Sequence, residues 1–240
     1  MTITRPLPKI DPRTVPVLSV DSHLPDVPAR HLTPEALRER FRRPPVWTPE
    51  SSVEKKFGDR QPAPAAVLIA LVMRQELTLL LTERSLNLST HSGQISFPGG
   101  RTDEGDSDPV HTALREAEEE VGLSARHVQV IGELPVYITG TSFWVTPVIG
   151  LVSPDFELRL NAEEVADVFE VPLSFLMNPA NHRRHAFEWQ GSQRHWFSMP
   201  YEERRTAPNG EVQAVEHFIW GATAGMLRNF YRFLAANPST

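Results

Sequence analysis

The segment from residue 97 to residue 123 constrains this chain most, because it joins a glycine pair to an unusually acidic helix. It reads FPGGRTDEGDSDPVHTALREAEEEVGL. Asp108 predicts a helix N-cap, and Pro109 then occupies the first helical position. The helix is expected to run to Val121, and Gly122 suits the left-handed residue that follows a last turn.

Three glutamates of this helix share one face. Glu116, Glu119 and Glu120 are spaced at i, i+3 and i+4, whereas Glu118 points elsewhere and is read as surface. Like charges at this spacing destabilise a helix by a few tenths of a kcal/mol per pair. A divalent cation removes that cost, and carboxylate oxygens are the ligands that Mg²⁺ and Mn²⁺ prefer. Taken alone, the same run could also be a solvated acidic face.

The flanking residues favour the metal site. The order of the glycines, a loop acid and the run REAEEEVGL resembles the Nudix box, G-x5-E-x7-R-E-U-x-E-E-x-G-U with U aliphatic. The match is complete from Arg115 to Leu123 if alanine is allowed at U. Two departures concern the loop: Asp106 replaces the usual glutamate, and the gap to Arg115 is one residue longer. The resemblance implies that Asp106 forms a salt bridge with Arg115 and fixes the loop on the helix.

A second stretch narrows the resemblance to one branch of this family. Residues 80–100 read LLTERSLNLSTHSGQISFPGG, which is similar to the coenzyme A pyrophosphatase pattern L-L-T-x-R-[SA]-x3-R-x3-G-x3-F-P-G-G. The second arginine of that pattern is replaced by Ser89, which bears on substrate identity more than on reaction type. Residues 145–150 and 217–224 also match, so the resemblance covers roughly residues 33–236.

Mixed strand and helix patterns predict an α/β fold. The expected strands are 65–73, 77–82, 94–97, 128–137 and 143–152, with a hairpin of 184–190 and 194–200; helices are expected at 33–43, 172–177 and 216–235, and 163–169 is ambiguous. This mixture indicates a central mixed β-sheet between helices, an α/β/α sandwich. The resemblance implies the same Nudix-type fold.

The chain divides into two parts at about residue 62. Residues 1–62 are expected to be a proline-rich extension with one short helix (33–43), because 12 of the 22 prolines precede residue 65. Within it, residues 1–32 are read as a poorly ordered arm or one that wraps a neighbour. Residues 63–236 are expected to form the Nudix hydrolase domain, which includes the C-terminal helix 216–235.

Composition excludes several function classes. The net charge of −6 makes a dedicated nucleic-acid partner improbable, since that role needs a basic face. The chain has no cysteine, so disulfides, thiol nucleophiles and cysteine metal sites are excluded. Its longest apolar run, residues 65–73, is far shorter than the roughly 20 residues that span a bilayer. We expect no membrane partner, no secretory signal and a cytoplasmic location.

The resemblance implies hydrolysis of a pyrophosphate bond in a nucleoside diphosphate linked to another group, with Mg²⁺ or Mn²⁺ as cofactor. Glu116 and Glu120 are the expected metal ligands, joined by a backbone carbonyl of Gly99 or Gly100. Glu119 is either a third ligand or the base that activates water, and both roles stay open. Arg115 completes the expected catalytic set. Glu163 and Glu164 are candidates for a glutamate outside the box; the alternative for both is surface.

Substrate contacts are expected from the loop side. Arg84 is the main candidate for the phosphates because a guanidinium offers bidentate hydrogen bonds, with Arg101 and the backbone of Gly99 beside it. A surface role for Arg84 is the alternative. His91 is read as structural or as a ligand of a substrate oxygen. Four aromatic residues could flank an adenine or belong to the core: Tyr137, Phe143, Trp189 and Trp196.

The leading hypothesis is a pyrophosphatase that cleaves coenzyme A or its thioesters into adenosine 3′,5′-bisphosphate and 4′-phosphopantetheine. The same reaction on ADP-ribose, NADH, dinucleoside polyphosphates or a capped RNA end is the first alternative. A catalytically silent nucleotide sensor is the second, although all three box glutamates are present. The proline-rich arm and the C-terminal helix are candidates for a homodimer interface.

Overall fold

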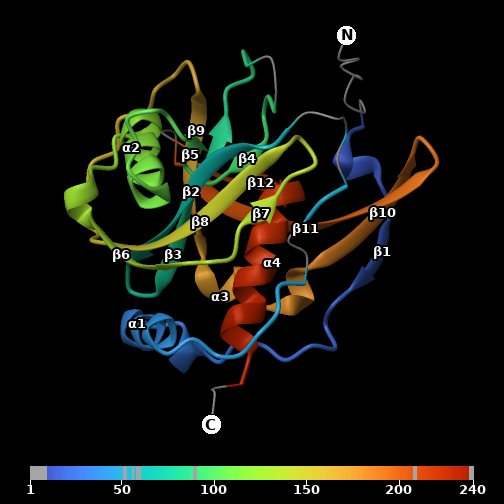
Figure 1. Ribbon diagram of the computed structural model, residues 1–240, viewed down its shortest axis with the longest axis horizontal. Helices are drawn as coiled ribbons and strands as arrows, with labels where there is room; N and C mark the ends of the chain where they lie inside the picture. Colours follow the sequence, from blue (N-terminus) through green and yellow to red (C-terminus); the bar gives the residue numbers. More distant parts are fainter. Residues whose placement is uncertain are drawn as a thin grey trace.

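The computed structural model describes residues 10–50, 53–55, 57, 61–88, 91–207 and 210–237, and these fold around a mixed β-sheet (Figure 1). The strands of this main sheet are β2 (Ala63–Met73), β3 (Leu77–Arg84), β4 (Ile95–Ser96), β5 (Gly99–Arg101), β6 (Val128–Glu133), β7 (Tyr137–Ile138), β8 (Phe143–Val152) and β9 (Val165–Pro172). The strands β2 and β8 run parallel, and the other pairs are antiparallel. The sheet is therefore mixed, as the sequence predicts.

Helices cover both faces of the main sheet, because the strands are apolar on both sides. Along β2, Leu68 and Val72 belong to the cluster that packs on α2 (Pro109–Val121), whereas Ile69 and Leu71 belong to the cluster that includes α4 (Gly221–Ala235). Successive side chains of a strand point to opposite faces, so an uninterrupted apolar strand requires two covers. The result is the predicted α/β/α sandwich.

The acidic helix α2 has the predicted boundaries and caps. The Asp108 carboxylate accepts a hydrogen bond from the N–H of His111 at 2.8 Å, and Gly122 adopts φ 72°. Ala117 and Val121 are completely buried against the sheet. This packing fixes the rotation of the helix and so the direction of its glutamates.

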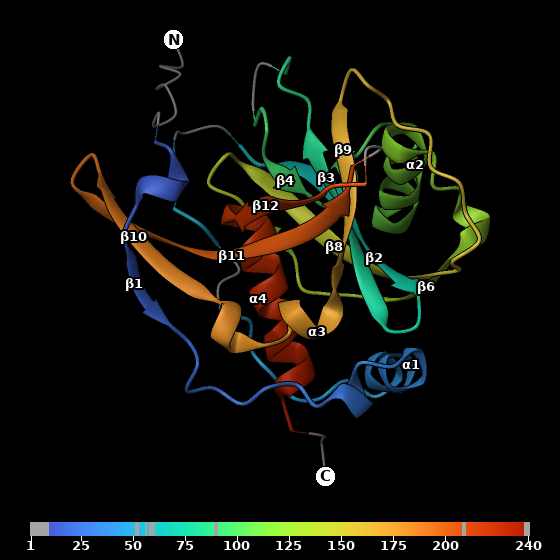
Figure 2. The same cartoon turned by 180° about the vertical axis from the view of Figure 1, so that it is seen from behind.

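A second sheet lies beyond α4, and the sequence predicted only its central hairpin. Its order is β1 (Val17–Val20), β10 (Arg183–Trp189), β11 (Ser192–Thr206) and β12 (Val212–Trp220). Figure 2 shows α4 between this sheet and the main sheet. Phe197, Met199 and Ile219 of the second sheet join the same core cluster as α4, so the helix is buried from two sides.

The predicted C-terminal helix of residues 216–235 begins too early. Residues 216–220 belong to β12, and the helix starts at Gly221, which adopts φ 64°. The residues from His217 to Trp220 are aromatic or β-branched, and they fit a pleated surface better than a helix. The turn at Gly221 separates the two elements.

Residues 10–32 are more integrated than the predicted arm. The strand β1 pairs with β10 at the edge of the second sheet, and Asp21 is buried just after it. Residues 1–9 lie outside the described residues. The following helix is confirmed as α1 (Pro34–Arg42), where the hydroxyl of Thr33 accepts from the N–H of Ala36.

Smaller differences concern strand ends. The predicted strand 128–137 is divided into β6 and β7, and the ambiguous segment 163–169 is the beginning of β9. The short helix expected at 172–177 is α3 (Leu173–Leu176). Short 3₁₀ helices lie at Pro12–Thr14, Ala29–His31, Ala125–His127 and Pro179–Asn181.

A buried ionic cluster joins the N-terminal segment to α4 and the second sheet. Arg228 of α4 is 1% exposed and pairs with Asp21 at 2.9 Å and with Glu50 at 2.5 Å. Arg184 of β10 pairs with the same two acids at 2.7 and 2.5 Å. The imidazole of His182 accepts a hydrogen bond from Arg228, and burial lowers its pKa to about 4, so this ring is neutral at pH 7. Two positive and two negative charges therefore balance in this cluster, with Arg228 and Asp21 buried and Arg184 and Glu50 partly exposed.

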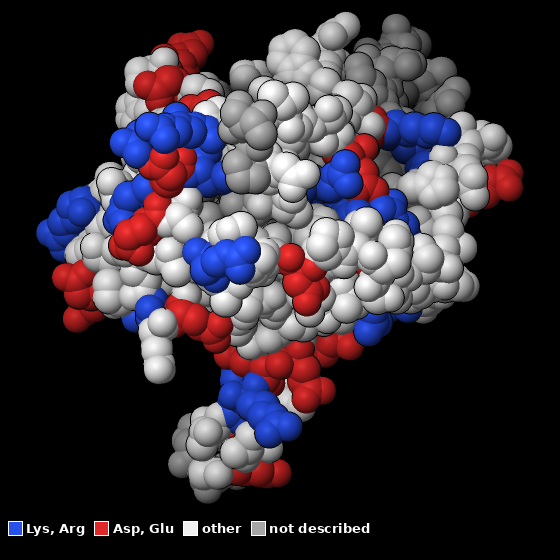
Figure 3. Space-filling view, turned by 90° about the horizontal axis from the view of Figure 1, so that it is seen from below, with Lys and Arg blue, Asp and Glu red and all other residues white. Residues whose placement is uncertain are grey.

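Charges on the outside are mixed. The face at the C-terminal end of α4 carries basic and acidic side chains next to one another, around a largely uncharged centre (Figure 3). Across the described ranges, no helix has both the length and the apolar character needed to cross a bilayer.

Removing one partner of the buried ionic cluster should strongly destabilise the fold. Arg228→Met leaves Asp21 and Glu50 with less compensation in a buried setting, and we expect a loss of about 3–5 kcal/mol in the free energy of unfolding. Urea denaturation measures it. Arg43→Ala is the control, because Arg43 is 78% exposed in its pair with Glu39 and should change stability by less than about 1 kcal/mol. Equal effects of the two substitutions would contradict this account.

Candidate active site

The three glutamates of α2 lie on one face but differ in exposure. The side chain of Glu120 is 4% exposed, that of Glu116 is 15% and that of Glu119 is 58%. Glu120 therefore lies deepest against the sheet and Glu119 at the rim. The sequence predicted the shared face and did not predict this gradient.

The glycine pair brings backbone into direct contact with two of these carboxylates. The N–H of Gly99 donates to Glu120 at 3.1 Å. Gly99 adopts φ 154°, and a Cβ there would lie 2.4 Å from a carbonyl oxygen of β2. A Cβ on Gly100 would lie 2.5 Å from the carboxyl group of Glu116. Only glycine permits such an approach at both positions.

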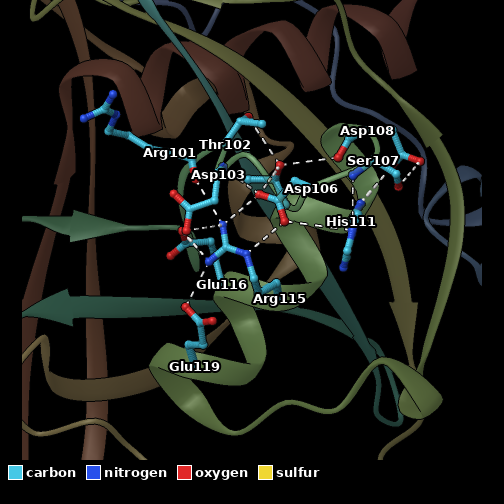
Figure 4. A network of polar contacts seen from close by, with 11 residues as sticks. Arg101, Thr102, Asp103, Asp106, Ser107, Asp108, His111, Arg115, Glu116 and Glu119 are labelled. Atoms are coloured by element: carbon cyan, nitrogen blue, oxygen red, sulfur yellow. Dashed lines mark hydrogen bonds and ion pairs between the residues drawn. The ribbon is translucent and has the colours of Figure 1, made fainter.

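The salt bridge predicted between loop and helix is present. Arg115 donates to both carboxylate oxygens of Asp106, at 2.9 and 2.8 Å (Figure 4). Asp106 also accepts from the N–H of Asp103 and from the hydroxyl of Thr112. These contacts, with the Arg115 guanidinium first, hold the pKa of Asp106 far below its usual range. The shorter acid reaches the arginine despite the extra loop residue.

The remaining nitrogens of Arg115 hold the glutamates. Its Nη1 lies 2.9 Å from Glu119 and 3.0 Å from Glu116, and its Nη2 also donates to the carbonyl of Arg101. Each guanidinium nitrogen is therefore engaged within the protein. The geometry assigns Arg115 to positioning, since its donors are already used by the loop and the helix.

Arg84 is placed where a phosphate-binding residue was predicted. It ends β3, and its Nη1 lies 3.7 Å from a carboxylate oxygen of Glu120. This is an ion pair without a hydrogen bond, and the buried Nε has no hydrogen-bond partner in the part of the chain that the structure describes. Arg101 is exposed, and its side chain extends away from the acidic cluster in Figure 4. The geometry favours Arg84 over Arg101.

Glu164 is the glutamate outside the box that reaches this site. Its carbonyl accepts from the N–H of Ser85, next to Arg84, and its charge contributes to the raised pKa values of Glu116 and Glu120. Glu163 instead has its N–H bonded to the side chain of Asn161 in the preceding turn. Both acids were candidates from the sequence, and in the structure the charge of Glu164 acts on Glu116 and Glu120.

The pKa values of two glutamates are raised. Burial is the main cause for Glu120, whose pKa is raised to about 7 although the Gly99 N–H and the Arg84 charge act in the opposite direction. Burial also raises the pKa of Glu116, and the charge of Arg115 opposes it. A carboxylate that is desolvated and repelled by its neighbours gains from a bound cation.

The site fits a divalent cation through two carboxylates and backbone. Within the described ranges, no three acidic or histidine side chains converge as a complete metal site, and Glu119 is tied to Arg115. Mg²⁺ usually takes one or two protein carboxylates and fills its other positions with water and substrate phosphates. Glu116 and Glu120 lie against the glycine bend and could hold such a cation, with a carbonyl of Gly99 or Gly100 as the further ligand expected from the sequence.

Other predicted contacts are structural. His91 adopts φ 57° and bonds Gln94 within its loop. Tyr137 is buried and donates to Glu54, and Trp196 stacks on His185 of the second sheet. Ser89 lies outside the described residues. Two contacts were not predicted from the sequence: the hydroxyl of Thr112 donates to Asp106, and Glu54 accepts from Tyr137. For Thr112 the available signal was its position one turn after the N-cap of the helix.

The raised pKa of Glu120 should make the cation-free protein less stable as pH rises. The folded state holds this proton more tightly than the unfolded chain, so stability falls as pH increases from about 4.5 to about 7. Glu120→Gln removes the ionisation. We expect it to raise the free energy of unfolding by about 3 kcal/mol at pH 8 and to have little effect at pH 4.5. Urea denaturation in the presence of a chelator measures the free energy of unfolding at both pH values. A loss of stability in Glu120→Gln at pH 8 would contradict the raised pKa of Glu120.

Comparisons with known proteins agree with this geometry. A model of the NUDIX domain matches residues 62–198. A protein of Escherichia coli K12 described as the uncharacterized Nudix hydrolase NudL is 39% identical over 175 residues, which are 72% of this chain and 84% of that protein. The protein of the same description from Shigella boydii is 40% identical over the same coverage.

Solved structures of the family are more distant. An Ap4A hydrolase of Caenorhabditis elegans is 20% identical with a TM-score of 0.40, and the match covers 49% of this chain and 85% of that one. The NUDIX domain of NrtR from Shewanella oneidensis, complexed with ADP ribose, is 19% identical with a TM-score of 0.38, over 48% and 76%. On the domain match and the bacterial relatives, this chain belongs to the Nudix hydrolase family, whose enzymes use divalent cations to hydrolyse pyrophosphate bonds in nucleoside diphosphate-linked substrates.

Proposed function

We propose that this enzyme cleaves the pyrophosphate bond of coenzyme A or its thioesters, with Mg²⁺ or Mn²⁺ as cofactor. The observation that carries the proposal is the arrangement around Glu120 of residues that match the coenzyme A pattern. Gly99 and Arg84 contact Glu120 directly, and the N–H of Gly93 closes the loop on the carbonyl of Arg84. The products are adenosine 3′,5′-bisphosphate and 4′-phosphopantetheine or its acyl form.

The contacts described above support the following roles. Glu116, Glu120 and a glycine carbonyl would hold the cation, which would supply neutralisation of the diphosphate and a lower pKa for a bound water. Arg84 has free donors for two non-bridging oxygens of the substrate. Glu119 and Glu164 are the two acids placed to accept the proton as water attacks phosphorus and the second phosphate leaves. Arg115 and Asp106 hold the helix and loop in register.

A second substrate class has its own support. Ser89 replaces the second arginine of the coenzyme A pattern, so one expected positive charge is missing from the substrate loop. ADP-ribose, NADH and dinucleoside polyphosphates contain the same reacting diphosphate without the 3′-phosphate of coenzyme A. They are the alternative substrates to test.

Incubation with coenzyme A and either cation should release adenosine 3′,5′-bisphosphate, which chromatography resolves. Glu120→Gln and Glu119→Gln should each lower kcat/KM by orders of magnitude, because each removes a cation ligand or a base. Glu118→Gln is the matched control: this acid on the same helix is exposed, and kcat/KM should stay within about twofold.

The outcomes separate the hypotheses. Intact coenzyme A beside cleaved ADP-ribose would reject the coenzyme A proposal and keep the enzyme class. Absence of turnover by the wild type over the whole nucleotide panel would favour a sensor. Circular dichroism of each variant shows whether its fold is retained.

The contact between the glycine bend and the glutamates gives a second test. Gly100→Ala places a methyl group against the Glu116 carboxylate and should lower kcat/KM by about 100-fold, the effect of a displacement of about 1 Å at a reacting site. Gly105→Ala is the control in the same loop, because a Cβ there meets nothing within 4 Å. Similar activity in the two variants would mean that the glycine contact does not position Glu116.

A further inference from the structure

The two arginines of the site are used differently. Arg115 is tied by Asp106 as well as by Glu116 and Glu119, so its place is fixed. Among the described residues, the charged partner of Arg84 is Glu120, at 3.7 Å. The guanidinium of Arg115 is therefore fixed by loop and helix. The guanidinium of Arg84 is paired with a carboxylate that is itself an expected metal ligand.

The guanidinium of Arg84 has N–H donors that the described residues do not use. Its side chain is 26% exposed, its buried Nε has no hydrogen-bond partner among the residues that the structure describes, and the contact with Glu120 is longer than a hydrogen bond. A buried donor without an acceptor costs free energy. The Arg84 guanidinium would regain that free energy by binding a phosphate oxygen bidentately.

A cation at Glu120 and the guanidinium of Arg84 act on the same carboxylate. Glu120 is almost completely buried, and one of its oxygens already accepts from Gly99. The other oxygen faces Arg84. Two positive groups at this oxygen repel each other in a setting with little solvent to screen them, so each weakens the binding of the other.

We propose that Arg84 is an exchange residue: it neutralises Glu120 in the free enzyme and moves to the phosphates of a nucleoside diphosphate, which releases Glu120 to the divalent cation. The inference rests on the proposed function in assuming a diphosphate substrate and a cation at this site. It adds that nucleotide and cation bind cooperatively through one side chain. By linkage, each ligand tightens the other by the same factor.

The exchange predicts opposite effects of one substitution on the two ligands. Arg84→Met keeps an unbranched side chain that fills part of the same space, and it removes the guanidinium charge. It should tighten Mn²⁺ binding to the nucleotide-free protein by about fivefold, the lower end of typical coupling between sites. It should also weaken binding of the nucleotide, because the phosphate contact is lost.

A charge-matched control separates exchange from general electrostatics. Arg101→Met removes the same charge beside the glycine bend, where the exposed side chain extends away from the glutamates. It should change Mn²⁺ affinity by less than about twofold, since solvent screens an exposed charge.

Mn²⁺ dissociation constants are measured by electron paramagnetic resonance of the free ion at about pH 8.5, where carboxylates are ionised. Each protein is titrated with and without α,β-methylene adenosine diphosphate, which is not hydrolysed between its phosphates. The wild type should bind Mn²⁺ more tightly with the nucleotide, and the Arg84→Met variant should lose most of that gain. Circular dichroism confirms that both variants are folded.

Two results would overturn the exchange: unchanged or weaker Mn²⁺ binding by nucleotide-free Arg84→Met, or an equal gain in Arg101→Met. Neither depends on turnover. An enzyme that cleaves its substrate without this coupling would therefore reject the exchange alone. A protein inactive on every nucleotide would instead reject the proposed function.

Discussion

The contact between the glycine bend and the buried carboxylate of Glu120 is the constraint on which the site depends. The strand β5 must pair with β2 and also offer its backbone to the helix, so side chains at Gly99 and Gly100 are excluded. Burial then leaves Glu120 as a desolvated acid beside other acids. The pairing of β5 with β2, the rotation of α2 and the proposed cation site therefore all depend on Gly99 and Gly100.

Arginine charge organises the same region at two levels. Arg115 ties the loop acid Asp106 to the helix and restrains Glu116 and Glu119, which like-charge repulsion would otherwise separate. Arg84 balances the deepest acid while leaving donors unused. The contacts of Arg115 are rigid because its guanidinium is saturated with hydrogen bonds. The contact of Arg84 can be exchanged because its guanidinium is not saturated.

Local patterns predicted the site better than the periphery. Caps, spacing and helix periodicity defined α2, and the loop salt bridge followed from the motif. The gradient of exposure from Glu119 to Glu120 could not be read, because it depends on how the sheet edge meets the helix. The predicted start of the C-terminal helix was wrong, and residues 1–32 were read as an arm, because only tertiary pairing reveals β1 and β12 as strands. Long-range contacts override weak local signals.

The second sheet has a consequence for how the chain is made. Its edge strand β1 comes from the beginning of the chain, and its other strands come from the last third. During synthesis on the ribosome, β1 must therefore wait for its partner β10, which begins only at Arg183. Closing so large a loop is entropically slow. The outer layer beyond α4 is thus the last to assemble, well after the glutamate helix has been translated.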